Sequence, residues 1–121
     1  MILDTKTGIW LCEPEESKKI HKIDTKLCNS LISFFNSQPT KIDGVVDLGC
    51  GDGKYIEKLS EHFECIGFDG NSATKEITNG LGEVLDLSVK QPDLIKRRKD
   101  WVLSIEVGNH IPRKSEKNFI Q

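Results

Sequence analysis

The sequence predicts an α/β protein in which a parallel β-sheet is covered by helices on both faces. Short apolar runs of strand length alternate along the chain with segments of helical character. The first run of the core, residues 45–48, leads into three alternating glycines, a turn at which the backbone can approach a ligand closely. At 121 residues the chain suits a single domain, with an N-terminal helical segment at 1–39 and a core at 40–121.

The N-terminal segment is predicted to be mainly helical. Pro14, Glu15 and Glu16 form a typical first helical turn, since proline lacks an amide and acids suit the positive helix end. Asp24 is also a good N-cap, so one helix or two remain open. Residues 9–11 form an apolar patch that we expect to cover another part of the protein. Apolar residues at steps of three and four predict a buried helix face before Pro39: Ile20, Ile23, Leu27, Leu31 and Phe34.

The core is predicted to hold four strands, at residues 45–48, 64–68, 83–85 and 101–105. Helices are expected at 51–62, at 72–79 and after Pro112, and Gly80 suits the C-terminal cap of the second of them. Residues 86–99 are predicted to form a polar connection with one turn of helix near 93–95. Its basic run, residues 96–99, is interpreted as a solvated surface.

Composition limits the partners that we expect. A net charge of −2 provides no long-range attraction to nucleic acid or to an anionic membrane. No apolar run reaches the roughly 20 residues of a membrane span, and the N-terminus lacks the features of a signal peptide. The four cysteines form no Cys-x-x-Cys pair and are interpreted as reduced, buried residues of a cytoplasmic protein: Cys12, Cys28, Cys50 and Cys65.

The spacing of the glycines distinguishes two classes of nucleotide ligand. Dinucleotide-binding proteins use Gly-x-Gly-x-x-Gly, because their pyrophosphate approaches the start of the helix. Here the third glycine comes one place early, at Gly53, and Lys54 stands where that motif needs glycine. The order Val-Val-Asp-Leu-Gly-Cys-Gly-Asp-Gly at 45–53 instead resembles motif I of the class I S-adenosylmethionine-dependent methyltransferases. Asp69, at the tip of the next predicted strand, extends the resemblance, and an NAD-dependent reductase is the less favoured alternative.

The resemblance covers residues 40–112 and implies both fold and cofactor. Complete members of this family have seven strands in the order 3-2-1-4-5-7-6. This chain corresponds to the cofactor-binding half, a Rossmann-like three-layer α/β/α core with the truncated order 3-2-1-4. The implied cofactor is S-adenosyl-L-methionine, with S-adenosyl-L-homocysteine as product. The implied cofactor-binding residues are Asp47, Gly49, Cys50, Gly51, Gly53, Asp69, Gly70, Asn71, Asp86, Leu87 and Glu106.

In that family the glycine loop lines the methionine moiety, and the acid corresponding to Asp69 binds both ribose hydroxyls. A carboxylate suits this task because it can accept two hydrogen bonds. The family often places an acid like Asp86 beside the adenine amino group. Structural alternatives remain open for each acid: Asp47 as a structural carboxylate, Asp69 as a helix N-cap and Asp86 as a turn residue.

Residues 106–112 resemble the Glu-x-x-Glu-His-(Ile/Val)-Pro segment of ubiquinone-type and related small-molecule methyltransferases. Some relatives bind a divalent metal with this segment, but Asn109 replaces the second acid here, so no metal site is expected. His110 is a candidate general base, since imidazole titrates near neutrality, and Glu106 is a second candidate catalytic residue. The alternative is that His110 shapes the loop. Trp10 and Trp101 are interpreted as packing residues, and His21 as an exposed helix residue.

The predicted strand at 101–105 is apolar on both faces and would lie at an open sheet edge. Such an edge needs a cover, which we predict to be a second copy of the chain, the N-terminal segment or another subunit, with a homodimer favoured. The predicted function is methyl transfer to a small-molecule acceptor. The alternative is a non-catalytic module that binds S-adenosylmethionine or S-adenosylhomocysteine, or a subunit of a larger methyltransferase.

Overall fold

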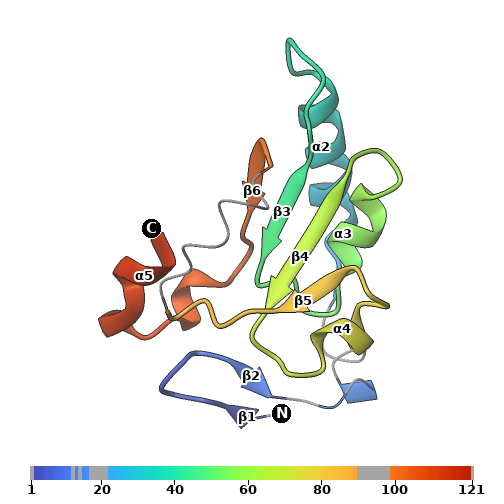
Figure 1. Ribbon diagram of the computed structural model, residues 1–121. Helices are drawn as coiled ribbons and strands as arrows, with labels where there is room; N and C mark the ends of the chain where they lie inside the picture. The colour runs from blue at the N-terminus through green and yellow to red at the C-terminus, as the bar shows by residue number, and fades with distance from the viewer. Residues whose placement is uncertain (1, 12, 14, 17–21, 90–98, 121) are drawn as a thin grey trace.

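The computed structural model describes residues 2–11, 13, 15–16, 22–89 and 99–120 (Figure 1). Its centre is a four-stranded parallel sheet in the order β5-β4-β3-β6. The strands are β3 (Val45–Leu48), β4 (Cys65–Asp69), β5 (Gly82–Val84) and β6 (Trp101–Leu103). The predicted fold class and the order 3-2-1-4 are therefore confirmed.

Strand β6 is two residues shorter than predicted. Its three residues pair with Val45–Asp47, and the ladder ends there. The next residue, Ser104, donates its hydroxyl to the Leu48 carbonyl at 3.2 Å, so that a side chain takes the place of a further backbone bond. Strands β4 and β5 each differ from prediction by one residue at both ends. These small shifts leave every predicted strand in its predicted place in the sheet.

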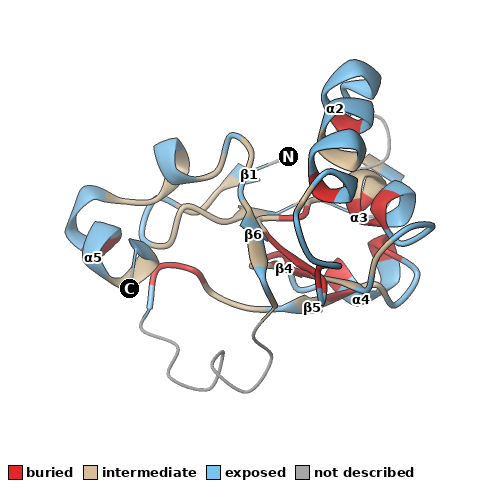
Figure 2. Ribbon diagram, turned by 90° about the horizontal axis from the view of Figure 1, so that it is seen from above, coloured by how far each residue is buried: buried red, intermediate tan, exposed pale blue. Residues whose placement is uncertain are grey.

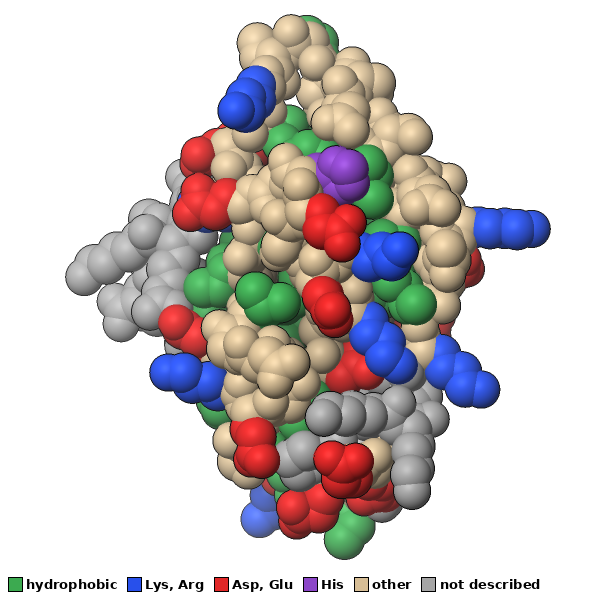
Figure 3. All heavy atoms as spheres, turned by 90° about the vertical axis from the view of Figure 1, so that its right-hand side faces the viewer, with side chains coloured by type: hydrophobic (Ala, Val, Ile, Leu, Met, Phe, Trp, Pro, Cys, Tyr) green, Lys and Arg blue, Asp and Glu red, His purple; other side chains and the backbone are tan. Residues whose placement is uncertain are grey.

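Helices lie on both sides of the sheet. Figure 2 shows α2 (Thr25–Asn36), α3 (Lys54–Leu59) and α4 (Thr74–Ile77) on one side and α5 (Glu116–Ile120) on the other. The 3₁₀ turns η2 (Gly108–His110) and η3 (Arg113–Ser115) lead from β6 to α5, close to where a helix was predicted. On the face that Figure 3 presents, acidic and basic side chains are intermixed, as is typical of a solvated surface. Within the described ranges no helix has the length and apolar character needed to cross a membrane.

Two predicted helices are much shorter than expected. The helix predicted at 51–62 starts only at Lys54, because Gly53 has a φ of 78° and a right-handed helix cannot pass through it. The helix predicted at 72–79 has four residues, since Asn79 and Gly80 both have left-handed backbone. Left-handed residues thus fix one end of each helix.

The N-terminal helix begins afresh after a non-helical stretch at 22–24. The Asp24 carboxylate accepts the Leu27 amide at 3.0 Å and caps α2. The buried residues of α2 are Cys28 and Phe35, whereas Leu27 and Phe34 of the predicted face are exposed. The prediction was therefore wrong for Leu27 and Phe34, whose next neighbours are buried instead, whereas Leu31 packs against the core as predicted. Ile20 and His21 lie outside the described residues.

Two packed regions surround the sheet. Phe35 packs with Ile42, Val45 and Leu59 in the core, and the Trp101 ring lies 5.8 Å from that of Phe35, which confirms Trp101 as a packing residue. At the opposite end, residues 2–11 form a hairpin, β1 (Ile2–Leu3) and β2 (Trp10–Leu11), beside the carboxyl ends of the strands (Figure 1). Residues 9–11 had been expected to cover another part of the protein, and Ile9 does so.

Candidate functional site

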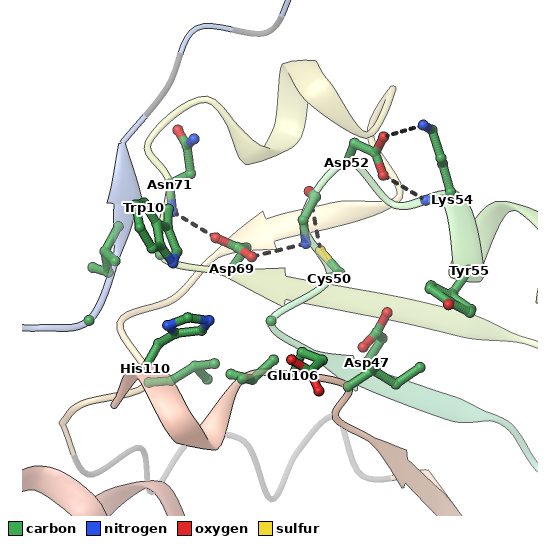
Figure 4. A pocket seen from close by; sticks show the side chains of 18 of the residues that line it. Trp10, Asp47, Cys50, Asp52, Lys54, Tyr55, Asp69, Asn71, Glu106 and His110 are labelled. Atoms are coloured by element: carbon green, nitrogen blue, oxygen red, sulfur yellow. Dashed lines mark hydrogen bonds and ion pairs between the residues drawn. The ribbon is translucent and has the colours of Figure 1, made fainter. Parts of the chain in front are cut away.

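A cavity of about 800 Å³ opens at the carboxyl ends of the parallel strands (Figure 4). The ends of β3, β4 and β6, the start of α3, the chain before α2 and the N-terminal hairpin all contribute to its wall. In parallel α/β sheets this edge is where ligands bind. Of the predicted site residues, the cavity brings together Asp47, Gly49, Cys50, Gly51, Asp69, Gly70, Asn71, Leu87, Glu106 and His110.

Two predicted cofactor-binding residues, Gly53 and Asp86, do not line this cavity. Gly53 shapes the turn that precedes α3, and its amide donates to the Cys50 carbonyl at 2.9 Å. The Asp86 carboxylate accepts the amide and the hydroxyl of Ser88 at 2.9 and 2.6 Å, so it stabilises the turn after β5. Both residues make turn contacts in the structure, and their contacts with a cofactor stay predictions.

The glycine loop is bonded to the neighbouring strand. The amides of Gly49 and Cys50 both donate to the Phe68 carbonyl of β4, at 2.7 and 3.0 Å. Gly49 has a φ of 80°, and the Val107 side chain packs directly against it, 2.3 Å from where a Cβ would be. The loop therefore needs glycine at this position for its backbone conformation and for its packing.

The Asp69 carboxylate joins the tip of β4 to the glycine loop. One oxygen accepts the Gly51 amide at 2.9 Å and the other accepts the Asn71 amide at 3.1 Å. The Asn71 side chain in turn accepts the Ala73 amide at 2.9 Å and shapes the start of α4, a role that the sequence had left open for Asp69. An ionised carboxylate has about four acceptor positions, so each oxygen of Asp69 retains capacity for a further donor.

Asp47 lies at the floor of the cavity with only 3% of its surface exposed. In the described part of the chain no group donates a hydrogen bond to its carboxylate. Burial first, and the negative charge of Asp69 second, raise its pKa from 3.8 to about 7. A buried carboxylate that faces a cavity without a donor is suited to a ligand that brings a positive charge or a donor.

Cys50 is the packing residue that the sequence had indicated. Its sulfur lies against the backbone of two strands, 2.8 Å from a Cβ position on Gly67 and 3.1 Å from one on Gly82. Burial, together with the charges of Asp47 and Asp69, raises the pKa of its thiol. The thiol therefore stays neutral and is unsuited to act as a nucleophile.

Polar side chains at one end of the cavity were not predicted from the sequence. The Lys54 ammonium pairs with the Asp52 carboxylate at 3.2 Å, and the Tyr55 hydroxyl accepts the Asp24 amide at 2.9 Å. The bond of Tyr55 ties α3 to the chain before α2, from which Lys22 also lines the cavity. Lys54 and Tyr55 directly follow the glycine motif, and this was the one signal that could have indicated them.

Residues after β6 form another side of the cavity. Glu106 has a φ of 57°, a left-handed conformation that is uncommon for a residue with a side chain and is often found at functional sites. The His110 ring meets the Trp10 ring edge to face, with centroids 5.6 Å apart. Asn109 does not line the cavity, and the described residues include no group of three or more His, Cys, Asp or Glu placed to hold a metal. Trp10 was predicted to serve packing alone, but its ring lines the cavity.

Comparison with known proteins identifies the fold. No protein-family model matches the chain, and no curated protein matches it. Among solved structures, the methyltransferase domain of bacterial CtHen1-CN is similar, with a TM-score of 0.59 and 19% sequence identity over 81% of this chain. The chain has a class I methyltransferase-like fold. The matched region spans 57% of that domain, so the similarity concerns little more than half of its length.

Proposed function

We propose that the cavity binds S-adenosylmethionine and that the protein transfers the methyl group to a small-molecule acceptor. One observation carries the proposal: Asp69 holds the glycine loop through Gly51 while each of its oxygens retains capacity for a donor toward the cavity. Two adjacent hydroxyls of a ribose match this capacity.

The charge of the site supports a cationic ligand. Asp47 and Asp69 both line the cavity, and Asp47 lacks a donor among the described residues. S-adenosylmethionine carries a sulfonium and an ammonium group, and either would favour the ionised form of Asp47. NAD carries two negatively charged phosphates, so the buried Asp47 and the glycine spacing both disfavour a reductase.

For methyl transfer, the protein's task is to align an acceptor and exclude water, because the sulfonium of S-adenosylmethionine already activates the methyl group. We assign His110 to accept a proton from the acceptor and Glu106 to orient it, since both residues line the cavity from the β6 side. Because Asp47, Asp69 and Glu106 line the cavity, an uncharged or cationic acceptor suits it better than an anionic one.

Calorimetry with S-adenosylhomocysteine tests the proposed cofactor. We expect the wild type to bind, and Asp69→Ala to weaken binding by about 1.5–3 kcal/mol, the range for hydrogen bonds to a charged group. Asp86→Ala is the matched control, because Asp86 is an acid at a neighbouring strand end whose carboxylate holds a turn. Equal affinities for the wild type and Asp69→Ala would contradict the assignment, and a loss in Asp86→Ala would restore the adenine contact that the resemblance implied.

A transfer assay separates enzyme from binding module. Labelled S-adenosylmethionine is incubated with the protein and a metabolite extract, and label in a small molecule is expected. Cofactor binding without transfer would favour the alternative, a binding module or a subunit of a larger methyltransferase. Titration with NAD is the remaining arm, and we expect no binding.

The open edge of the sheet supports a homodimer. Among the described strands β6 pairs only with β3, and Val102 on it is 61% exposed. Unpaired amides beside an apolar side chain can pair with a strand of a second copy of the chain. Light scattering at micromolar concentration is expected to give twice the mass of the monomer for the wild type, and the mass of the monomer for Val102→Lys.

The cysteines that the structure describes are free thiols, which supports a reducing, cytoplasmic location: Cys28, Cys50 and Cys65.

A further inference from the structure

The N-terminal hairpin forms one side of the cavity, although neither the glycine motif nor the segment after β6 belongs to it. Four of its residues line the space: Thr7, Gly8, Ile9 and Trp10. The turn packs against the chain after β6, since a Cβ on Gly8 would lie 2.2 Å from the His110 carbonyl oxygen. With the ring contact between Trp10 and His110, two residues of the hairpin pack against His110.

Ile9 takes the place of a side chain that residue 70 lacks. Gly70 directly follows Asp69, and a Cβ on it would lie 2.3 Å from Cγ1 of Ile9. The isoleucine therefore fills the space beside Gly70, the residue after Asp69, and supplies apolar surface to the cavity there. Leu87, in the chain after β5, adds apolar surface to the same cavity.

Trp10 and the polar group lie on different sides of Asp69. In Figure 4, Trp10 lies near Asn71 and His110 on one side of Asp69, and Lys54 and Tyr55 lie on the other. The cavity thus has an aromatic end and a charged end, with a carboxylate between them. A molecule with a planar ring on one side of a diol and a charged tail on the other has the same order of groups.

We propose that the hairpin is a ligand-binding element in which Ile9 and Trp10 form the platform for a planar nucleobase. This inference rests on the proposed function, in which Asp69 holds the ribose. A base attached to that ribose needs an apolar or aromatic surface, because stacking on a flat side chain is the main sequence-tolerant way to bind a base. Contact with His110 restrains the Trp10 ring before any ligand arrives, so little side-chain entropy is lost on binding.

Titrations of S-adenosylhomocysteine and of adenosine test the platform. Trp10→Ala is expected to weaken both ligands by about 5- to 100-fold, the range for loss of one stacking partner. Ile9→Ala is expected to weaken both by about 3- to 10-fold, as a few buried methyl groups are lost. Because the lost contact is to the base, each variant lowers the two affinities by the same factor.

The hairpin supplies its own controls. Leu11 and Ile2 form a cross-strand pair on it, are 44% and 70% exposed, and do not line the cavity. Leu11→Ala and Ile2→Ala remove apolar side chains of similar size from the same two strands. We expect both to bind adenosine within about twofold of the wild type.

Two readouts leave the hairpin intact, in case a variant fails to fold. The chain has two tryptophans, so Trp101→Phe makes Trp10 the sole indole emitter, and its fluorescence is expected to change when adenosine binds. Two-stranded hairpins are marginally stable by themselves. Adenosine is therefore expected to slow amide hydrogen exchange within residues 2–11 of the wild type.

The outcomes separate this inference from the proposed function. Suppose that Asp69→Ala weakens binding, but that Trp10→Ala and Ile9→Ala bind as tightly as Leu11→Ala. This result would overturn the platform and leave the cofactor assignment in place. An unchanged Trp10 emission at saturating adenosine also overturns it. Failure of the wild type to bind any adenosyl compound overturns the proposed function and the platform with it.

Discussion

Two walls of the cavity each contain a glycine against which an apolar side chain packs, and the two glycines differ in backbone conformation. In the glycine loop, Val107 lies 2.3 Å from a Cβ position on Gly49; at the hairpin wall, Ile9 lies 2.3 Å from one on Gly70. Gly49 has a φ of 80°, whereas Gly70 has no left-handed backbone. The glycine loop is therefore fixed by its backbone conformation together with its packing. The hairpin wall depends only on the packing of two segments that are far apart in the chain.

The largest expected effect follows from this difference at Gly49. Gly49→Ala adds left-handed strain of about 1–2 kcal/mol and overpacking of about 1–3 kcal/mol, so we expect a loss of roughly 2–5 kcal/mol in unfolding free energy. Urea denaturation measures it. Gly80→Ala is the matched control, since Gly80 has a φ of 85° and no atom within 4 Å of its Cβ position. Equal losses of unfolding free energy in the two variants would show that overpacking against Val107 does not contribute.

The next largest expected effect is a pH dependence of the unfolding free energy that comes from Asp47. Its folded pKa of about 7 lies above the ordinary 3.8, so the folded state holds more protons between these values and stability falls as pH rises through them. The shift of about three units corresponds to an upper limit of roughly 4 kcal/mol, complete above pH 7. Asp47→Asn is expected to match the wild type below pH 4 and to exceed it in unfolding free energy at pH 8. A difference that stays constant with pH would contradict this origin.

Ligand binding is expected to release a proton from the same wall. A cation beside Asp47 lowers its pKa, and a group with a pKa of about 7 is roughly half protonated at pH 7. S-adenosylmethionine should therefore release about half a proton per site. Calorimetry in buffers of different ionisation enthalpy measures the number, and Asp47→Asn should release none. Equal release by both proteins would assign the proton to another group.

The smallest effect tests the fit between hairpin and strand end. Gly70→Ala introduces a methyl group where Ile9 lies and is expected to destabilise by about 1–3 kcal/mol. In the Ile9→Ala background the same change should be nearly neutral, which gives a coupling of about 0.5–2 kcal/mol in a double-mutant cycle. Additive losses would show that the isoleucine is not the group that crowds residue 70. Circular dichroism of all four proteins checks that the sheet is retained.

Local patterns in the sequence determined the sheet and the centre of the site. Four apolar runs predicted four strands, and the resemblance around Asp47 and the glycine loop gave their order. Asp69 was predicted as a site residue because it ends the strand next to that loop, and parallel neighbours end at the same edge. The strands and the glycine turn themselves depend on residues close together in the chain, because neighbouring residues share one strand or one turn. The strand order and the place of Asp69 came from the resemblance.

Tertiary structure alone decided the rest of the wall. Nothing near Ile9 or Trp10 in the sequence indicates that a hairpin reaches Gly70 and His110, about 60 and 100 residues further along the chain. The pKa of Asp47 likewise depends on its burial and on the charge of Asp69. These properties arise from contacts between segments far apart in the chain, and such contacts exist only once the whole chain has packed.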